Sequence, residues 1–419
     1  MSRNTVWHPF TQHGLEPEPE LIVRGKGAWL ETIDNRRIVD AISSWWVVTH
    51  GHRHPAIVAA INQQAGKLDQ VIFAGFTHEP AEILADNLID IVPKGLEHVF
   101  FSDSGSTAVE VAIKMALGYW RNIGQPRTRI AALEHGYHGD TIGTMSAGSR
   151  SVFNAAYEPL LFDVVRLPFP HPGREQETVD ALERACETGP LAALIVEPLI
   201  AGAGGMLMYE PAALAEMRLI CEHYGTLFIA DEVMTGWGRT GKLFACEHAG
   251  VTPDILCLAK GLTGGSLPLA ATLATSAIFE AHYSTDRAKT FFHSSSYTAN
   301  PICCAAAAAN LEIWQREPVG KRIAELTVLQ AQHLASLDGN PHFANPRQIG
   351  TIAALDLVVP DAGYLAGATL PLRRHFTSRG VLLRPLGNTI YVMPPYCTTG
   401  PDLDLIYDAI RSAPTALGL

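Results

Sequence analysis

The fold of this chain is decided by two stretches of sequence, LFIADEVMTGWGRTG at residues 227–241 and PDILCLAKGLTGG at residues 253–265. In each stretch a short apolar run, residues 227–230 and 255–259, ends at a charged residue, Asp231 and Lys260. Apolar runs of this length without alternation are typical of strands buried on both faces of a parallel sheet. The two stretches therefore predict neighbouring strands that present Asp231 and Lys260 at their ends.

The two side chains together suit the binding of a cofactor that carries an aldehyde and a heterocyclic nitrogen. A lysine at the mouth of a buried strand is positioned to lose its proton and form an imine. A carboxylate at the neighbouring mouth can hold a protonated heterocyclic nitrogen, and pyridoxal phosphate needs both groups. On the pair alone, an ordinary α/β enzyme with Asp231 as a helix cap and Lys260 in solvent is equally compatible.

Size and composition limit the class of protein. A chain of 419 residues exceeds one typical hydrophobic core, which predicts two domains. The net charge of −11, with no block of basic residues, argues against nucleic acid or an anionic membrane as a partner. The first residues, MSRNTVWHPFTQHG, contain no apolar core of a secretory signal, and no apolar run approaches the ~20 residues of a transmembrane helix. Seven cysteines without CxxC spacing are typical of reduced thiols, so we expect a cytoplasmic protein.

The pattern of apolar residues changes twice along the chain. From about 55 to 310, helices alternate with short buried strands, which predicts an α/β fold with a mainly parallel sheet covered by helices. The expected division is a large cofactor-binding domain at 51–310 and a smaller α+β domain built from residues 1–50 and 311–419. In the small domain we expect strands at 21–23, 28–32, 37–40 and 351–359, a strand pair at 381–384 and 389–393, and helices at 311–336, 370–378 and 402–412.

A candidate phosphate site lies at residues 100–107, FFSDSGST, where a strand leads through small residues into a helix. Free N–H groups at the helix start, with the hydroxyls of Ser106 and Thr107, would cradle a phosphate. A plain N-cap is at least as compatible with these residues. The stretch is not a nucleotide-binding P-loop, because no Gly-Lys-Ser/Thr follows.

Histidines cluster at two places, His50/His52/His54 and the stretch HGYHGD at 135–140. A zinc site would need further ligands in a compatible geometry, and the sequence points to none, so no metal is predicted. For the stretch HGYHGD we prefer another role to metal binding, in which Tyr137 stacks its ring on one face of a planar cofactor.

Two tryptophans and two arginines are candidates for a substrate cleft. Trp45 and Trp46 cannot both point into one core from a strand, because side chains alternate, so one of them is expected to line a cleft. Arg384 ends the apolar run 381–383, where bidentate binding of a carboxylate is its best-suited task, although an internal salt bridge is also compatible. Arg239, in the loop GWGRTG, is a second candidate for an anion or a water network.

The stretches DEVMTGWGRTG and PDILCLAKGLTGG closely resemble the signature of class III aminotransferases, which are fold-type I enzymes that use pyridoxal phosphate. The match extends from Trp7 to about Tyr396. Further stretches resemble the branch of this family that aminates 8-amino-7-oxononanoate in biotin biosynthesis, namely WHPFTQ, SSWWVVTHGHRHP, FFSDSGSTAVEVAIKMALGYW, EHGYHGDTIGTMSAG, VEPLIAGAGGM and LRPLGNTIYVMPPY.

The resemblance implies a fold with a seven-stranded, mainly parallel sheet, and a role for individual residues. Lys260 would be the lysine that binds the cofactor aldehyde, Asp231 the partner of the ring nitrogen, and Tyr137 the cover of the ring. Gly105 and Ser106 would bind the phosphate. The substrate cleft would be formed by Phe10, Trp45, Trp46, Tyr137, Asp140, Arg239, Lys260, Ser294, Arg384 and Tyr391.

In this family a short segment from the second subunit of a homodimer also touches the phosphate. Here that segment contains Ser294, Ser295 and Ser296, where the best-known members carry Gly-Pro-Thr. Ser296 keeps a hydroxyl for the phosphate. A second departure is Phe10, where a tyrosine often stands, and its missing hydroxyl bears on the fit of the amino donor.

The implied reaction is a two-stage transamination that moves an amino group, usually from S-adenosyl-L-methionine, to 8-amino-7-oxononanoate and gives 7,8-diaminononanoate. The nearest alternative is another class III ω-aminotransferase that acts on a diamine or an ω-amino acid, for example lysine. An alternative from another class is an NAD-dependent oxidoreductase built around GAGG at residues 202–205. Because this stretch does not open a helix, we interpret it as a flexible loop.

Overall fold

The computed structural model describes residues 5–16, 18–360 and 362–419. Residues 1–4, part of the stretch that lacks a signal-peptide pattern, lie outside the described residues. The strands are β1 (Ile22–Lys26), β2 (Trp29–Thr32), β3 (Arg37–Asp40), β4 (Leu96–Ser102), β5 (Arg129–Leu133), β6 (Val165–Leu167), β7 (Leu191–Val196), β8 (Ile200–Ala201), β9 (Leu207–Met208), β10 (Leu227–Asp231), β11 (Ile255–Leu258), β12 (Ala270–Thr275), β13 (Phe343–Ile349), β14 (Ile352–Leu357), β15 (Val381–Leu382) and β16 (Thr389–Val392). The α-helices are α1 (Ser43–Trp46), α2 (Pro55–Ala65), α3 (Glu79–Ile91), α4 (Gly105–Asn122), α5 (Ile142–Ala147), α6 (Glu175–Thr188), α7 (Pro211–His223), α8 (Cys246–Ala249), α9 (Ser276–His282), α10 (Pro301–Arg316), α11 (Val319–Ala335), α12 (Thr369–Ser378), α13 (Gly400–Arg411) and α14 (Ala413–Ala416).

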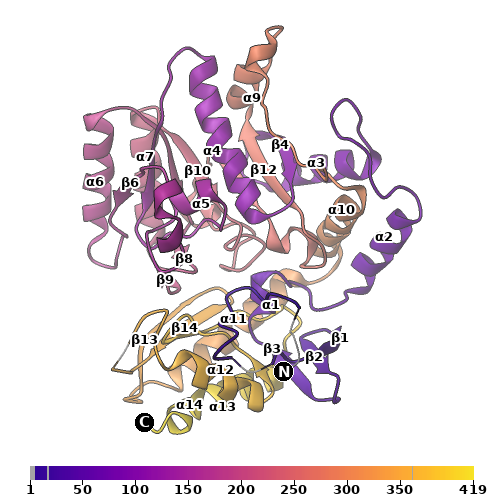
Figure 1. Ribbon diagram of the computed structural model, residues 1–419, viewed down its shortest axis with the longest axis vertical. Helices are drawn as coiled ribbons and strands as arrows, with labels where there is room; N and C mark the ends of the chain where they lie inside the picture. The colour runs from indigo at the N-terminus through magenta and orange to yellow at the C-terminus, as the bar shows by residue number, and fades with distance from the viewer. Residues whose placement is uncertain (1–4, 17, 361) are drawn as a thin grey trace.

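A seven-stranded sheet forms the upper part of the molecule, with the strand order β4-β12-β11-β10-β7-β5-β6 (Figure 1). Strand β12 runs antiparallel to both of its neighbours, and the other pairs are parallel. Helices lie on both faces of this sheet, as parallel strands joined by helical crossovers require. The predicted α/β fold with a mainly parallel sheet is confirmed.

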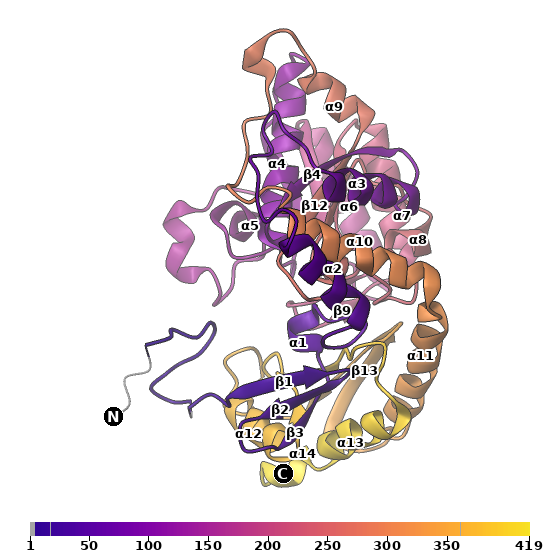
Figure 2. The ribbon, with the colours of Figure 1, turned by 90° about the vertical axis from the view of Figure 1, so that its right-hand side faces the viewer.

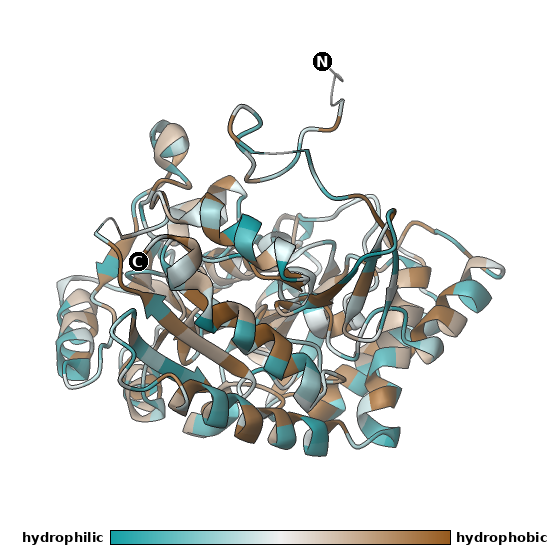
Figure 3. Cartoon of the chain, turned by 90° about the horizontal axis from the view of Figure 1, so that it is seen from below, coloured by the Kyte–Doolittle hydropathy of each residue, from teal (hydrophilic) through white to brown (hydrophobic). Residues whose placement is uncertain are grey.

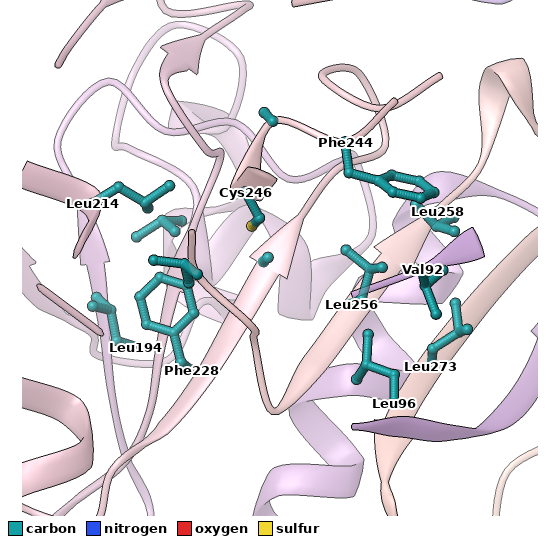
Figure 4. Close-up of a cluster of buried hydrophobic side chains, with 14 of the residues drawn as sticks. Val92, Leu96, Leu194, Leu214, Phe228, Phe244, Cys246, Leu256, Leu258 and Leu273 are labelled. Carbon is teal, nitrogen blue, oxygen red and sulfur yellow. The ribbon is translucent and has the colours of Figure 1, made fainter. Parts of the chain in front are cut away.

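The sheet is held by side chains that are buried on both faces. All six residues of β7 are buried, as are the four of β11, which explains their unbroken apolar sequences. On one face, Leu194, Phe228 and Leu256 pack into a large cluster (Figure 4). On the other face, isoleucine and alanine side chains of the strands pack against α4. Strands β11 and β10 are the third and fourth of the seven strands, so both lie inside the sheet with a strand on either side.

The lower part of the molecule contains two smaller sheets, β1-β2-β3-β15 and β13-β14-β16. Strand β15 lies parallel to β3, and Val381 is the partner of Val39. As expected, the N-terminal strands join the C-terminal part of the chain in space (Figures 1 and 2). A second hydrophobic core, which includes Leu355, Phe376 and Tyr407, fills this part. Seen from below, the helices alternate teal and brown around their axes, as amphipathic helices on a core do (Figure 3).

Two expectations for the C-terminal part are wrong. The single helix predicted at 311–336 is two helices, because α10 already begins at Pro301 and a break at Glu317 and Pro318 separates it from α11. Proline cannot donate a backbone hydrogen bond, so the chain turns there. The stretches predicted as a pair, 381–384 and 389–393, lie in different sheets, because β15 pairs with β3 and β16 pairs with β14.

Within the described residues, no helix is long and apolar enough to cross a membrane.

Candidate active site

Asp231 and Lys260 lie at the carboxyl ends of β10 and β11. Asp231 is the last residue of β10, and its partner in the parallel pair is Cys257 of β11. Lys260 follows three residues beyond Cys257, in a left-handed backbone conformation with φ of 48°. Because both strands end at the same edge of the sheet, both side chains enter one crevice, which is where ligands bind in open α/β sheets.

A cavity of about 440 Å³ opens at this edge. Its volume lies within the range of sites for small ligands. Predicted residues that line it are Trp46, Gly105, Ser106, Tyr137, Asp231 and Lys260. The structure thus brings together predicted residues from five separate segments of the chain.

The start of α4 forms one end of the cavity. Ser104 caps the helix in a capping box with Thr107, and Gly105 and Ser106 form its first turn. A side chain at Gly105 would come within 2.6 Å of Val233 Cγ1, so only glycine fits there. The Oγ of Ser106 accepts the N–H of Asp140, at 3.2 Å, which ties this turn to the loop that carries Tyr137. The N-cap and the phosphate site are therefore compatible. Ser104 caps the helix, and Gly105 and Ser106, which follow it, line the cavity.

His138 holds the carboxylate of Asp231. Its Nδ1 donates to Asp231 Oδ2 at 2.7 Å, and the N–H of Val233 donates to Oδ1 at 3.1 Å. Both side chains are almost fully buried. Two donors keep the carboxylate in one orientation, with its remaining acceptor capacity available to the cavity. His138 belongs to the HGYHGD motif, but no role of this histidine was predicted from the sequence.

Glu197 is a buried carboxylate in the cavity wall that the sequence analysis did not select. It accepts the N–H of Tyr137 at 2.9 Å and that of Gly202 at 3.1 Å. Burial raises its pKa to about 7, and the nearby Asp231 contributes to the rise. It joins the segment with Tyr137 to the turn at 202–205. The only signal in the sequence was its place directly after the buried strand that is now β7.

The side-chain amine of Lys260 is activated as a nucleophile by its surroundings. Burial lowers its pKa to about 8 against the opposing attraction of Asp231 and Glu197, so far more of its amine is uncharged near neutral pH than in an ordinary lysine. Its Nζ lies 4.6 Å from the centroid of the Trp46 ring. An amine held in such a site can attack a carbonyl and can also accept and return a proton.

Tyr137 stands between two cavities. Besides the first, it lines a second cavity of about 270 Å³ together with Asp140, Phe153 and Tyr364. The rings of Phe153 and Tyr364 meet edge to face at 4.4 Å. These two aromatic residues were missed, because Phe153 and Tyr364 lie in loops without a recognisable pattern.

Trp45 and Trp46 lie in a tight turn, α1, in which four consecutive residues are left-handed, with φ of 53° at Ser43, 45° at Ser44, 70° at Trp45 and 74° at Trp46. Each such residue costs roughly 1–2 kcal/mol for an L-amino acid. The turn sends Trp46 into the first cavity and leaves Trp45 partly exposed. Trp45 lines a third cavity, of about 580 Å³, together with Arg373 and Arg384, and this third cavity is called the mouth below. Trp46 thus lines a cleft, although it does so from a turn and not from the strand that the prediction assumed. A role of the pair in binding substrate stays a prediction.

Arg384 and Phe10 meet at the mouth. The Arg384 guanidinium lies 5.2 Å from the Trp45 ring centroid and donates to the backbone carbonyl of Phe10 at 2.8 Å. Phe10 in turn packs edge to face on Trp45 and on Phe153. The alternative of an internal salt bridge for Arg384 is not what the structure shows, since this hydrogen bond goes to a carbonyl.

Arg239 and Tyr391 lie behind the cavity. Arg239 is buried and donates to the carbonyls of Trp46, Val48 and Pro394, so it supports the backbone next to the turn. The hydroxyl of Tyr391 accepts the indole N–H of Trp46 at 3.0 Å. Both residues touch the wall of the predicted cleft from outside, and a direct contact with substrate stays a prediction.

Ser294, Ser295 and Ser296 lie on the surface at a distance from this set. They form a turn in which Ser294 Oγ and Thr298 Oγ1 both contact the carbonyl of Ser295. The carbonyl of Ser296 accepts from Gln70 at 2.7 Å. The residues that line the first cavity, among those described, do not include these serines.

The other motifs have structural roles. In the described part of the chain, no group of three metal-ligating side chains is arranged to hold a metal ion. His52 binds Asp40 at 2.9 Å, and His54 binds Glu317 at 3.0 Å. The glycines at 202–205 form the turn between β8 and β9 rather than the start of a helix.

These residues fit pyridoxal phosphate. The helix start at Gly105 and Ser106 suits the phosphate, and Tyr137 can cover a planar ring. The doubly held Asp231 suits a protonated ring nitrogen, and Lys260 supplies the amine for an aldehyde.

The family model of the class-III aminotransferases matches residues 11–413, and the chain belongs to this family. It is 51% identical, over 97% of both chains, to the adenosylmethionine-8-amino-7-oxononanoate aminotransferase of Synechococcus elongatus. The crystal structure of the enzyme with the same name from Methanocaldococcus jannaschii superimposes with a TM-score of 0.93 at 36% identity over 97% of both chains. An amine transaminase from an uncultivated Pseudomonas species, in its PLP-bound form, gives the same TM-score at 32% identity over 98% of both chains.

The comparisons confirm the predicted family, the fold class and the aminotransferase class of enzyme. With the family, pyridoxal phosphate is confirmed as the cofactor. The alternative of an NAD-dependent oxidoreductase is wrong.

Proposed function

We propose that this protein is the aminotransferase of biotin biosynthesis that converts 8-amino-7-oxononanoate to 7,8-diaminononanoate, with S-adenosyl-L-methionine as amino donor. Relatives over the full length of the chain carry the corresponding name. The observation that carries the chemistry is the single cavity that joins Lys260, Asp231, Tyr137 and the start of α4.

Each residue has a task that follows from its position. Pyridoxal phosphate, when bound, supplies an aldehyde that takes up the amino group and a ring that accepts the electrons of the donor's Cα–H bond. Lys260 Nζ takes the proton from the donor Cα and later returns a proton to the acceptor. Asp231 holds the proton on the ring nitrogen, and the hydrogen bonds from His138 and Val233 orient its carboxylate.

The substrate groups occupy the mouth. Arg384 binds the carboxylate of each substrate in turn, because a guanidinium offers two parallel donors to a carboxylate. The Trp pair and Phe10 pack on the alkyl chain, and Asp140 faces a polar end of the substrate in the second cavity. Arg239 and Tyr391 hold this wall in place.

Rescue of a biotin auxotroph that lacks this step tests the function. The wild-type gene should restore growth without biotin, and Lys260→Ala should not. Purified protein mixed with S-adenosyl-L-methionine, lysine or another amine should lose the cofactor absorbance with the true donor only. Failure to rescue, with a normal half-reaction for another amine, would contradict the proposal.

A second candidate is a class III ω-aminotransferase that uses lysine or a diamine. Structural relatives that are named ω-transaminases favour it at 26–29% identity. The departure at Phe10 bears on the donor, since a phenyl ring offers no hydroxyl to a polar amine. The donor comparison above separates the two candidates.

We further propose a cytoplasmic homodimer whose subunits share their active sites. The exposed side chains of Phe292 and Tyr297, on either side of Ser294–Ser296 in the chain, support this arrangement. In it, Ser295 and Ser296 reach the phosphate in the partner's cavity. If so, Lys260→Ala and Ser296→Asp subunits, each inactive alone, should regain roughly a quarter of the activity when mixed, because one of the four sites formed by random mixing is intact.

The division into domains at 1–50, 51–310 and 311–419 is also our proposal. The two separate hydrophobic cores support it. The break between α10 and α11, at Glu317 and Pro318, supports a second boundary a few residues later than 310.

A further inference from the structure

Asp40, the last residue of β3, is a buried carboxylate that no motif singled out. Its side chain is completely inaccessible, and a buried carboxylate persists only where its hydrogen bonds are satisfied. Oδ1 accepts the N–H groups of Ile42 at 3.3 Å and Ser44 at 2.9 Å. Oδ2 accepts the hydroxyl of Ser44 at 2.7 Å and the Nε2–H of His52 at 2.9 Å.

Three of these four contacts go to the left-handed turn or to the residue that opens it. A run of four left-handed residues is strained, and such strain survives only where the surrounding structure imposes it. Ser43 Oγ, at the start of the turn, donates to the carbonyl of Met393 at 2.8 Å. The far end of the turn is held by Arg239, which donates to the carbonyl of Trp46 at 3.2 Å. Asp40 holds the near end.

We infer that Asp40 is a positioning residue for substrate recognition, because it imposes the left-handed turn that points Trp45 to the mouth and Trp46 to Lys260. If the turn relaxed to right-handed backbone, the two indole rings would leave these directions. Trp46 would then lose its contact with Lys260 Nζ, now 4.6 Å from the ring centroid, and Trp45 its contact with Arg384. The inference deepens the proposed function and rests on it for the identity of the substrate.

The test compares Asp40→Ala with Asp40→Asn and with a matched control. Asparagine keeps one oxygen that can accept both backbone N–H groups, so it should rescue most of the effect. Asp34→Ala is the control, since Asp34 lies in the loop between β2 and β3, and its carboxylate binds Arg36 at 2.8 Å rather than the left-handed turn. His52→Ala, which removes one of the four contacts, serves if Asp40→Ala does not fold.

Two measurements decide the matter. Asp40→Ala should raise KM for 8-amino-7-oxononanoate by about tenfold or more with kcat within about threefold, as the loss of several hydrogen bonds to a charged group implies. Hydrogen–deuterium exchange in the apo-protein should accelerate at residues 41–49 and stay unchanged elsewhere. His52→Ala should shift both values in the same direction by less.

An unchanged KM in folded Asp40→Ala overturns the inference. The inference is also overturned if hydrogen–deuterium exchange becomes faster across the whole chain and kcat and KM change in step with the loss of stability. Such a result would show that Asp40 has a merely structural role. If the wild-type protein does not aminate 8-amino-7-oxononanoate at all, the proposed function fails. Exchange at 41–49 and KM for the amine that the wild type accepts then still decide the role of Asp40.

Discussion

His138 Nδ1 and Asp231 Oδ2 lie 2.7 Å apart, and neither side chain is more than 5% exposed. His138→Leu removes this donor and leaves the carboxylate of Asp231 short of a partner. A hydrogen bond to a charged group contributes about 1.5–3 kcal/mol, so kcat should fall about 10- to 100-fold. His138→Asn, whose amide N–H can take the place of Nδ1–H, should recover part of the rate. Equal rates for the leucine and asparagine variants would show that this hydrogen bond is not what matters.

The loss of a proton from Glu197 should lower the free energy of unfolding of the apo-protein as the pH rises towards 7. Its pKa is raised from 4.5 to about 7 by burial, so the folded state binds the proton more tightly than the unfolded state. The resulting stabilisation is present below about pH 4.5 and is lost as the pH rises to about 7. Glu197→Gln cannot titrate, so its melting temperature should lack this decline between pH 5 and 7.5. Glu177→Gln is the control, because the pKa of the exposed Glu177 is lowered by Arg174 instead.

Lys260 should react with amine reagents at lower pH than an ordinary lysine. Its pKa of about 8 makes half of the amine available near pH 8, whereas a lysine with the usual value of 10.5 stays protonated. Acetylation of the apo-protein over pH 6 to 11, followed by mass spectrometry of the peptide that contains Lys260, should give a midpoint near 8. The other lysine peptides in the same digest provide the reference. A midpoint above 10 for Lys260 would contradict this account of the site.

Arg384→Lys should weaken the binding of substrates that carry a carboxylate. Lysine keeps the charge but loses the planar pair of donors, so KM for 8-amino-7-oxononanoate should rise about 10- to 100-fold. Amine donors without a carboxylate should be used as before. Arg373→Lys is the control, because Arg373 pairs with Glu16 at the same mouth, at 2.5 Å. A similar loss for both kinds of substrate would mean that Arg384 acts on the fold of the mouth rather than on the carboxylate.

The sequence predicted those parts of the fold that rest on local patterns. Unbroken apolar runs placed β10 and β11, and the small residues before α4 placed its start, each within one or two residues. The break at Pro318 was missed because the apolar pattern continues on both sides of it. The partners of β15 and β16 were missed because strand pairing depends on distant residues, which local patterns do not contain.

The candidate site divides in the same way. Lys260, Asp231 and Tyr137 stand out because their motifs have few other uses. Glu197 and Asp40 do not, because a carboxylate at a strand end is common and only its burial makes it notable. The left-handed turn of Trp45 and Trp46 was also out of reach, since nothing in the residue types Ser-Ser-Trp-Trp favours positive φ.

The pairing of β3 with β15 has a consequence for the synthesis of this protein. During synthesis, Val39 cannot pair with Val381 until the ribosome has added 342 further residues. At about 5–20 residues per second, β3 leaves the ribosome roughly 20 to 70 s before its partner exists. During that time one edge of β3 is open, and an open edge recruits strands from other chains. A message truncated after the codon for residue 380 would therefore yield an aggregating product even though every residue of the large sheet is present.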